Sequence, residues 1–199
     1  MSPPCYTLVE RPLSGNCWKV RLCLAELQSP YLSLSPEDLG AAEFAALSRR
    51  RRVPVLIETA RPPLEESAAI LMRLAQGTHL LPDQDRDVIL SWLIWDQAEL
   101  SKALALPRFY ARTGRSDCHA EEIARLQDQA HEGLSFLESW LIEHDWLAGR
   151  CFTAADIGVF CYVDLAGEAG IDISHYAAIN AWRNRIRARP FWLPLVSDP

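Results

Sequence analysis

Two short segments combine residue types that can bind a small peptide. In residues 52–58, a run of aliphatic side chains surrounds Pro54. Proline has no N–H to give to a sheet, so it occurs at the first residue of a strand or on an edge. The N–H and C=O of Val53 are then free to pair with an extended ligand. Further along, Glu66 and Ser67 begin an apolar helix, and the unpaired N–H groups of a helix start suit a carboxylate. Together the segments predict a site for a short peptide with a free carboxylate.

A third segment offers groups that act on sulfur. Ser14 ends a turn-forming stretch, residues 11–16, just before a predicted helix. A hydroxyl donor and a helix N-terminus both favour a bound thiolate, which is the reactive form of a thiol. The Asn16 amide can donate in the same way, and a Cys17 thiol at a helix start can itself be activated and form a mixed disulfide. An ordinary helix N-cap at Ser14 is the structural alternative.

The elements that would position these residues alternate between strands and helices. Strands are predicted at residues 5–10, 31–34 and 55–57, with a possible further strand at 59–61, and helices at 17–27, 36–47 and 66–75. Apolar residues at helical spacing, such as Val20, Leu24 and Leu27, support the first helix. This order predicts a thioredoxin-like α/β domain over residues 1–77.

Strand signals disappear in the rest of the chain. A polar stretch, residues 78–85, is predicted to be a linker, and residues 86–199 are predicted to form an all-α domain. Its helices are expected at 88–106, ending before Pro107, at 120–144, at 157–163 as a buried central helix, and at 176–189, ending before Pro190.

The segment from Thr153 to Asp156 has the form of a capping box, with an acid three residues after the N-cap threonine. Asp156 is therefore predicted to be structural. Its replacement by alanine should cost roughly 0.5–2 kcal/mol, as for other caps.

Composition excludes several classes of protein. The formal net charge of −6 argues against a nucleic-acid partner, because phosphate binding requires a basic face. No apolar run reaches the roughly 18 residues of a membrane span, and the first residues lack a signal-peptide pattern, so a cytoplasmic protein is expected. The six cysteines show neither CxxC spacing nor a pairing with histidines, so neither a disulfide framework nor a metal site is predicted.

The chain resembles the glutathione transferase superfamily in several motifs. VPVL at residues 53–56 is followed by LEESAAILMRLA at 64–75, with SGNCWKVR at 14–21 upstream and FTAADI at 152–157 and RPF at 189–191 downstream. These motifs extend over nearly the whole chain in the family's order, and they are most similar to bacterial-like, serine-type members. The resemblance implies a thioredoxin-like domain followed by an all-helical C-terminal domain, with glutathione as co-substrate and no metal.

The resemblance also implies roles for the site residues. The Val53 backbone pairs with the cysteinyl part of glutathione beside a cis Pro54. Ser67 takes the γ-glutamyl carboxylate and Glu66 its amino group, although the two residues would equally serve as a helix-capping pair. Arg52 corresponds to a basic residue that reaches the glycine carboxylate.

One loop departs from the family pattern. Many members have Asn-Pro-x-Gly-Lys/Arg before the valine and proline, whereas this chain has Ser48 followed by four arginines, residues 49–52. The loss of the glycine predicts a loop of different shape. The three arginines before Arg52 are interpreted as a solvated face.

The implied activity is conjugation of the glutathione thiolate to small hydrophobic electrophiles, as in detoxification. Tyrosine-type members place the activating tyrosine where this chain has Glu10, so Ser14 is favoured, with Asn16 and Cys17 as further candidates. The electrophile pocket is expected between the domains, near Leu13 and the pair Phe109 and Tyr110, and a homodimer is expected. Alternatives are a glutathione-dependent thiol transferase, peroxidase, isomerase or dehalogenase, or a non-catalytic interaction module of the same fold.

Overall fold

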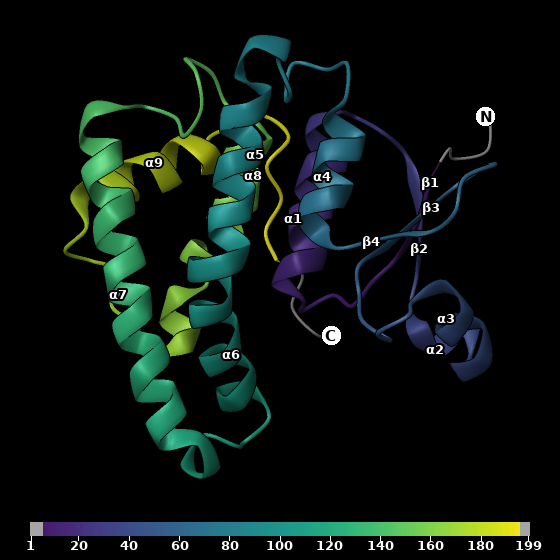
Figure 1. The fold of residues 1–199 in the computed structure, drawn as a ribbon, viewed down its shortest axis with the longest axis horizontal. Helices are drawn as coiled ribbons and strands as arrows, with labels where there is room; N and C mark the ends of the chain where they lie inside the picture. Colours follow the sequence, from purple (N-terminus) through teal and green to yellow (C-terminus); the bar gives the residue numbers. More distant parts are fainter. Residues whose placement is uncertain (1–5, 196–199) are drawn as a thin grey trace. The chain divides into compact units, whose positions relative to one another are not determined.

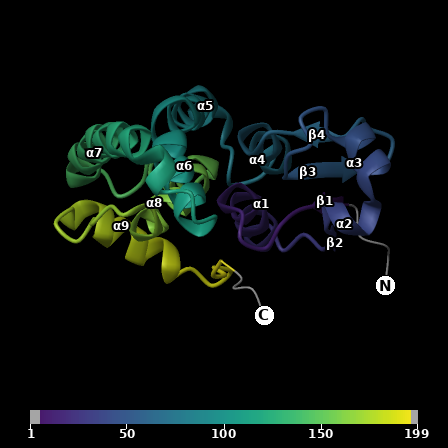
Figure 2. The same ribbon diagram turned by 90° about the horizontal axis from the view of Figure 1, so that it is seen from below.

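The computed structural model describes residues 6–195, and the chain forms two compact units (Figures 1 and 2). The first contains the chain up to Gln76 together with the segment from Pro190, and the second is Gly77–Arg189. The predicted domain ranges 1–77 and 86–199 stay a prediction, and in this division the predicted linker, residues 78–85, belongs to the second unit. The segment after Pro190 joins the first unit, where the indole Nε1 of Trp18 donates to the carbonyl of Leu193 (2.9 Å).

The first unit is built on a four-stranded mixed sheet. Its strands are β1 (Tyr6–Val9), β2 (Tyr31–Leu34), β3 (Val55–Glu58) and β4 (Leu64–Glu65), in the order β2-β1-β3-β4. β1 is parallel to β2 and antiparallel to β3, and β4 is antiparallel to β3. The thioredoxin-like fold is thus confirmed, while Cys5, which the predicted first strand included, lies outside the described residues.

Two details of the predicted order are wrong. The possible strand at 59–61 is a turn, in which Ala60 has a left-handed φ of 63°, and the last strand comes later, at β4. The single helix predicted at 36–47 is two short helices, α2 (Pro36–Leu39) and α3 (Ala41–Leu47). Gly40 separates them. Its φ of 77° is a value that glycine adopts readily, but it lies outside the right-handed helical region and so ends the first helix.

Two helices pack against each other on one side of this sheet, α1 (Gly15–Glu26) and α4 (Ser67–Ala75) (Figures 1 and 2). Their apolar residues, including Leu24 and Ile70, are fully buried. This packing sets the beginnings of the two helices side by side.

The loop that leads into α1 is held by a buried ion pair. Arg21 Nη1 lies 2.6 Å from Glu10 Oε2, and its Nη2 donates to the carbonyl of Pro12 (2.9 Å). Ser33 on β2 donates to the other Glu10 oxygen (2.8 Å). The sheet, α1 and the loop before Ser14 are therefore joined by one hydrogen-bonded group.

All the regular secondary structure of the second unit, residues 77–189, is helical. It contains α5 (Arg86–Trp95), α6 (Ser101–Arg112), α7 (Ala120–Glu143), α8 (Ala154–Asp164) and α9 (Ala177–Arg187), and a π-helical segment, Asp96–Leu100, joins α5 to α6. None of the helices within residues 6–195 is long and apolar enough to cross a membrane.

The prediction that a helix ends before Pro107 is wrong, because α6 continues through this residue to Arg112. Proline removes one backbone donor from a helix interior, usually at considerable cost. Here Pro107 is buried and α6 packs against α7, so tertiary packing outweighs the local preference.

Asp156 lies at the centre of the second unit with no exposed surface. Its Oδ2 accepts from the N–H (2.9 Å) and hydroxyl (3.3 Å) of Thr153, and its Oδ1 accepts from the N–H of Leu147 (3.1 Å) and the indole of Trp182 (2.9 Å). Burial raises the pKa of Asp156 to about 6, while these four donors act in the opposite direction. The predicted capping box is confirmed, and the same carboxylate also joins α9 to the loop before α8.

We expect Asp156→Ala to lower the free energy of unfolding of the second unit by about 3–5 kcal/mol, more than the cap alone would cost. The reason is that several buried donors would lose their acceptor, at roughly 1–3 kcal/mol each before relaxation. Urea denaturation followed by tryptophan fluorescence measures the change.

Asp38→Ala is the matched control. Asp38 occupies the same position of a capping box at α2, but its hydrogen bonds to Ser35 are exposed. A cost of only about 0.5–1 kcal/mol is expected there. Equal costs for the two variants would show that Asp156 is no more than a cap.

Candidate functional site

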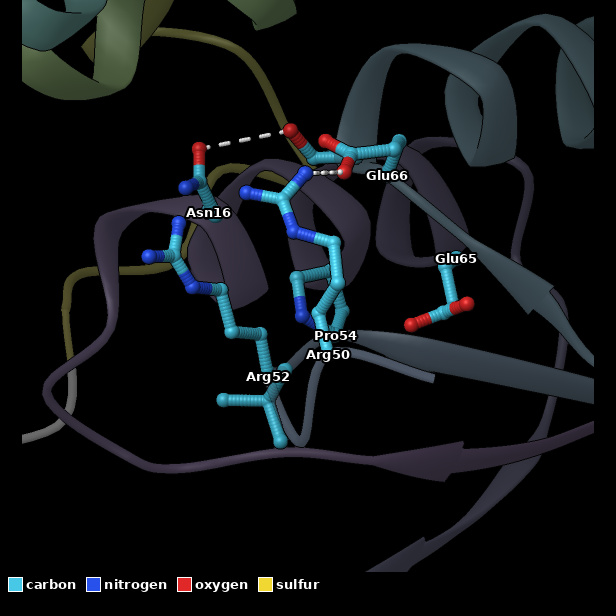
Figure 3. A pocket seen from close by; sticks show the side chains of 8 residues that line it. Asn16, Arg50, Arg52, Pro54, Glu65 and Glu66 are labelled. Atoms are coloured by element: carbon cyan, nitrogen blue, oxygen red, sulfur yellow. Dashed lines mark hydrogen bonds and ion pairs between the residues drawn. The ribbon is translucent and has the colours of Figure 1, made fainter. Parts of the chain in front are cut away.

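A pocket of about 70 Å³ lies in the first unit, at the starts of α1 and α4 (Figure 3). All five residues predicted to bind the peptide ligand line it, together with Asn16. The complete lining is Asn16, Arg50, Arg52, Val53, Pro54, Glu65, Glu66 and Ser67. The fold thus brings the segment around Val53 and Pro54 and the helix start at Glu66 and Ser67 together with Asn16, which belongs to the third segment, residues 11–16.

The two helix starts are linked across this pocket. The buried Ser67 donates its hydroxyl hydrogen to Oδ1 of Asn16 (3.3 Å), as Figure 3 shows. The amide nitrogen of Asn16 has no hydrogen-bond partner among residues 6–195 and can donate to a ligand. The first N–H groups of α4, which have no acceptor within the helix, begin at Ser67.

Val53 precedes β3, and the peptide bond between Val53 and Pro54 is cis. Within the described part of the chain, the N–H and C=O of Val53 form no hydrogen bond. These two groups are therefore available to an extended peptide, as the sequence predicted.

The buried Ser48 hydroxyl organises the loop of arginines. It accepts from the N–H of Arg52 (2.9 Å), and it lies within donating distance of the Glu65 carboxylate (2.9 Å) and of the Arg52 carbonyl (3.0 Å). The loop is thereby fixed to the end of β4.

The interpretation of these arginines as a merely solvated face is incomplete. Arg49 Nε lies 2.9 Å from Glu65 Oε2, and Arg50 Nη1 lies 2.8 Å from Glu66 Oε1. Arg50, Glu65 and Ser48 are site residues that the sequence reasoning missed. The signal that could have found them is the opposite charge of the arginine run and the Glu65–Glu66 pair.

Two residues at this site have left-handed backbone. Arg51, at the position where the family pattern has glycine, has a φ of 50°, and Glu66 has a φ of 70° with a ψ of 117°. Such values are uncommon for residues other than glycine, and they concentrate at ligand-binding sites.

Ser14 is the N-cap of α1, so the structural alternative is realised: its Oγ accepts from the N–H of Cys17 (3.3 Å). This bond uses a lone pair and leaves the hydroxyl hydrogen to donate elsewhere. Cys17 itself is fully buried, and burial raises the pKa of its thiol to about 11 although the Ser14 contact opposes the shift. Neither residue is part of the pocket lining. The structure therefore argues against Cys17 as a reactive thiolate.

The residues predicted for the electrophile pocket belong to different units. Leu13 is half-buried in the loop before α1, whereas Phe109 and Tyr110 lie on α6. The Tyr110 hydroxyl donates to Glu122 (3.0 Å) and its ring stacks on His119. The shared pocket stays a prediction.

No group of three or more His, Cys, Asp or Glu residues within residues 6–195 could hold a metal ion.

The left-handed backbone at Arg51 gives a stability test. We expect Arg51→Gly to raise the free energy of unfolding by about 0.5–1 kcal/mol, because the αL penalty of roughly 1–2 kcal/mol exceeds the extra chain entropy that glycine loses on folding. Urea denaturation measures the difference. Arg49→Gly is the control, since Arg49 has no positive φ, and it should destabilise the protein. A loss of stability in Arg51→Gly would contradict the strain argument.

Comparison with known proteins identifies the family of both parts of the chain. Residues 8–78 match the family model "Glutathione S-transferase, N-terminal domain", and residues 99–190 match "Glutathione S-transferase, C-terminal domain". The chain is 29% identical over 189 residues to "Disulfide-bond oxidoreductase YfcG" of Escherichia coli (strain K12), which covers 88% of this chain and 87% of that protein.

Solved structures give the same result. A glutathione S-transferase from Pseudomonas fluorescens Pf-5 is 30% identical with a TM-score of 0.91, and the match covers 97% of this chain and all of that one. Ure2p in complex with glutathione is 25% identical with a TM-score of 0.83, covering 96% of this chain and 93% of that chain. The Pseudomonas fluorescens protein is 30% identical over nearly the full length of this chain, and the two halves of the chain match the two domain models. The chain therefore belongs to the glutathione S-transferase superfamily.

Proposed function

We propose that this protein binds glutathione in the pocket of its first unit and conjugates the glutathione thiolate to small hydrophobic electrophiles. The observation that carries the proposal is the lining of the 70 Å³ pocket. Its residues come from three separate segments, and each offers the chemistry that one part of glutathione requires.

The tripeptide's charged ends would meet groups of opposite charge. The Arg52 guanidinium has no hydrogen-bond or ion-pair partner among the described residues and would bind the glycine carboxylate. Ser67 and the first N–H groups of α4 would bind the γ-glutamyl carboxylate, and Glu66 its ammonium group. The cysteinyl part would pair with the Val53 backbone, as a strand pairs with an open edge.

The sulfur would lie at the start of α1, where two donors are available. The Asn16 amide nitrogen and the Ser14 hydroxyl hydrogen stabilise an anion, and the positive end of the helix acts in the same direction. These groups lower the pKa of the bound thiol. The thiolate then attacks an electrophilic carbon held nearby, and proximity supplies much of the rate gain.

Glutathione-dependent disulfide reduction is the second candidate, and the similarity to YfcG favours it. The bound thiolate would attack one sulfur of a disulfide, forming a mixed disulfide and releasing the other sulfur as a thiolate. A second glutathione thiolate would then release the substrate thiol and leave oxidised glutathione. The attacking sulfur belongs to glutathione in this scheme, because Cys17, the cysteine at the start of α1, is buried.

A homodimer, a cytoplasmic location and a role in detoxification accompany this proposal by analogy with the family. The third possibility, an interaction module that does not turn over substrate, requires that the pocket be inactive. Turnover of a general electrophile decides between these possibilities.

Ser14→Ala should lower kcat with an aryl halide by about 10- to 100-fold, because one donor to the thiolate is lost. The affinity for glutathione should change less than about twofold, since binding rests on the other residues. Steady-state kinetics and calorimetric titration measure the two effects. The ultraviolet thiolate absorbance of bound glutathione should titrate at higher pH in the variant.

Two controls separate this effect from the loss of a helix cap. Ser14→Thr keeps the hydroxyl and should retain most activity. Ser35→Ala removes the corresponding N-cap of α2, which is not part of the pocket, and should leave kcat unchanged. Unaltered turnover in Ser14→Ala would leave Asn16 as the activating donor, and failure of the wild-type protein to bind glutathione would refute the proposal.

Cys17→Ala tests the source of the attacking thiol. Because the Cys17 thiol is buried and its pKa is raised to about 11, we expect disulfide reduction and conjugation to stay within about twofold of wild type. Mass spectrometry after incubation with oxidised glutathione should find no adduct on Cys17. An adduct there, together with loss of disulfide reduction in the variant, would instead make Cys17 the nucleophile.

A further inference from the structure

Arg50 forms an ion pair with Glu66 inside the pocket. Its Nη1 lies 2.8 Å from Glu66 Oε1, and Figure 3 shows the two side chains meeting in the pocket that Asn16 also lines. Both side chains are more than half exposed, at 58% and 59%. The pair therefore faces solvent at the position where the proposed function puts the γ-glutamyl end of glutathione.

Each partner keeps unused hydrogen-bonding capacity. Among residues 6–195, Glu66 Oε2 accepts no hydrogen bond and the other guanidinium nitrogens of Arg50 donate none. A carboxylate has about four acceptor sites and a guanidinium has five donors, so a single shared bond satisfies neither group. An open acceptor and open donors thus stand next to each other.

An α-amino acid end presents the complementary arrangement, with an ammonium group and a carboxylate on the same carbon. We infer that the Arg50–Glu66 pair binds this zwitterion as a unit: Glu66 Oε2 accepts from the ammonium, while Arg50 donates to the carboxylate beside Ser67. This inference rests on the proposed function and adds to it one binding residue, Arg50, which the family pattern does not assign to the ligand.

The backbone supports the same assignment. Glu66 has a φ of 70° outside regular structure, directly between β4 and α4, and its side chain is part of the pocket lining. A non-glycine residue persists in such a conformation only where the surrounding structure fixes it. The conformation keeps the carboxylate next to the Arg50 guanidinium and the buried Ser67.

Charge balance explains why both members are needed. Without Arg50, the Glu66 carboxylate and the ligand's carboxylate would be balanced by the ligand's ammonium alone, and like charges at close range repel. An exposed ion pair is weak, so both side chains can turn toward a ligand at little cost. The pair is therefore available to bind a ligand and does not hold the pocket closed.

Arg49 provides a matched control for Arg50. It forms an equivalent bond to the neighbouring acid, 2.9 Å from Glu65, but it is not part of the pocket lining. Both substitutions remove one exposed arginine from one loop. Only Arg50 should affect the ligand.

Calorimetric titration tests the inference with glutathione, N-acetylglutathione and a glutathione analogue whose γ-glutamyl α-carboxylate is an amide. We expect Arg50→Gln to weaken glutathione binding by about 3- to 10-fold and Arg49→Gln to change it less than twofold. Wild type should prefer glutathione over the amide analogue, and Arg50→Gln should lose most of that preference. Glu66→Gln should lose the preference over N-acetylglutathione.

Three outcomes overturn the inference. Equal affinities for Arg50→Gln and Arg49→Gln would show that Arg50 does not contact the ligand. Tighter binding by Arg50→Gln would show that Arg50 competes with the ammonium for Glu66. An unchanged preference over the amide analogue would place the carboxylate elsewhere. In each case wild-type binding of glutathione leaves the proposed function standing, whereas no binding by wild type removes both.

Discussion

The candidate site depends on the buried hydroxyl of Ser48, which joins the arginine loop before β3 to the end of β4. It accepts from the N–H of Arg52 and lies within donating distance of the carboxylate of Glu65, the last residue of β4. Arg49 also pairs with Glu65, and Arg50 pairs with Glu66, which follows β4. The Arg50–Glu66 pair is exposed on both sides, and such pairs contribute little to stability. The buried hydrogen bonds of Ser48 therefore provide most of the connection between the two segments.

The hydrogen bonds of Ser48 explain why an arginine loop can stand where many family members have a glycine-containing loop. Arg51 adopts the left-handed backbone that glycine would take at this position, and the contacts of its neighbours compensate for the strain. The loop ends at Val53, whose backbone groups have no hydrogen-bond partner among residues 6–195 and are the groups that the proposed function pairs with the ligand.

Local signals made most of the fold predictable. The proline before β3, the serine before α1 and the capping box at Thr153 each act within a few residues, so their sequence context suffices. The Arg50–Glu66 pair joins residues 16 apart through the β3–β4 hairpin, and a strand wrongly predicted at 59–61 hid the true position of that hairpin. Pro107 was misjudged for a related reason, since distant packing overrides its local preference.

The burial of Cys17 has a chemical consequence for the whole site. A helix N-terminus favours a thiolate only where solvent or donors can reach the sulfur, and Cys17 lies beneath the surface with its pKa raised to about 11. The same helix start keeps two donors, the Ser14 hydroxyl and the Asn16 amide, that the proposed function assigns to the sulfur of bound glutathione. Cys17 itself fills the core. Under that proposal the reactive sulfur comes with the ligand, so the recognition of the tripeptide's charged ends and the activation of its thiol would depend on each other.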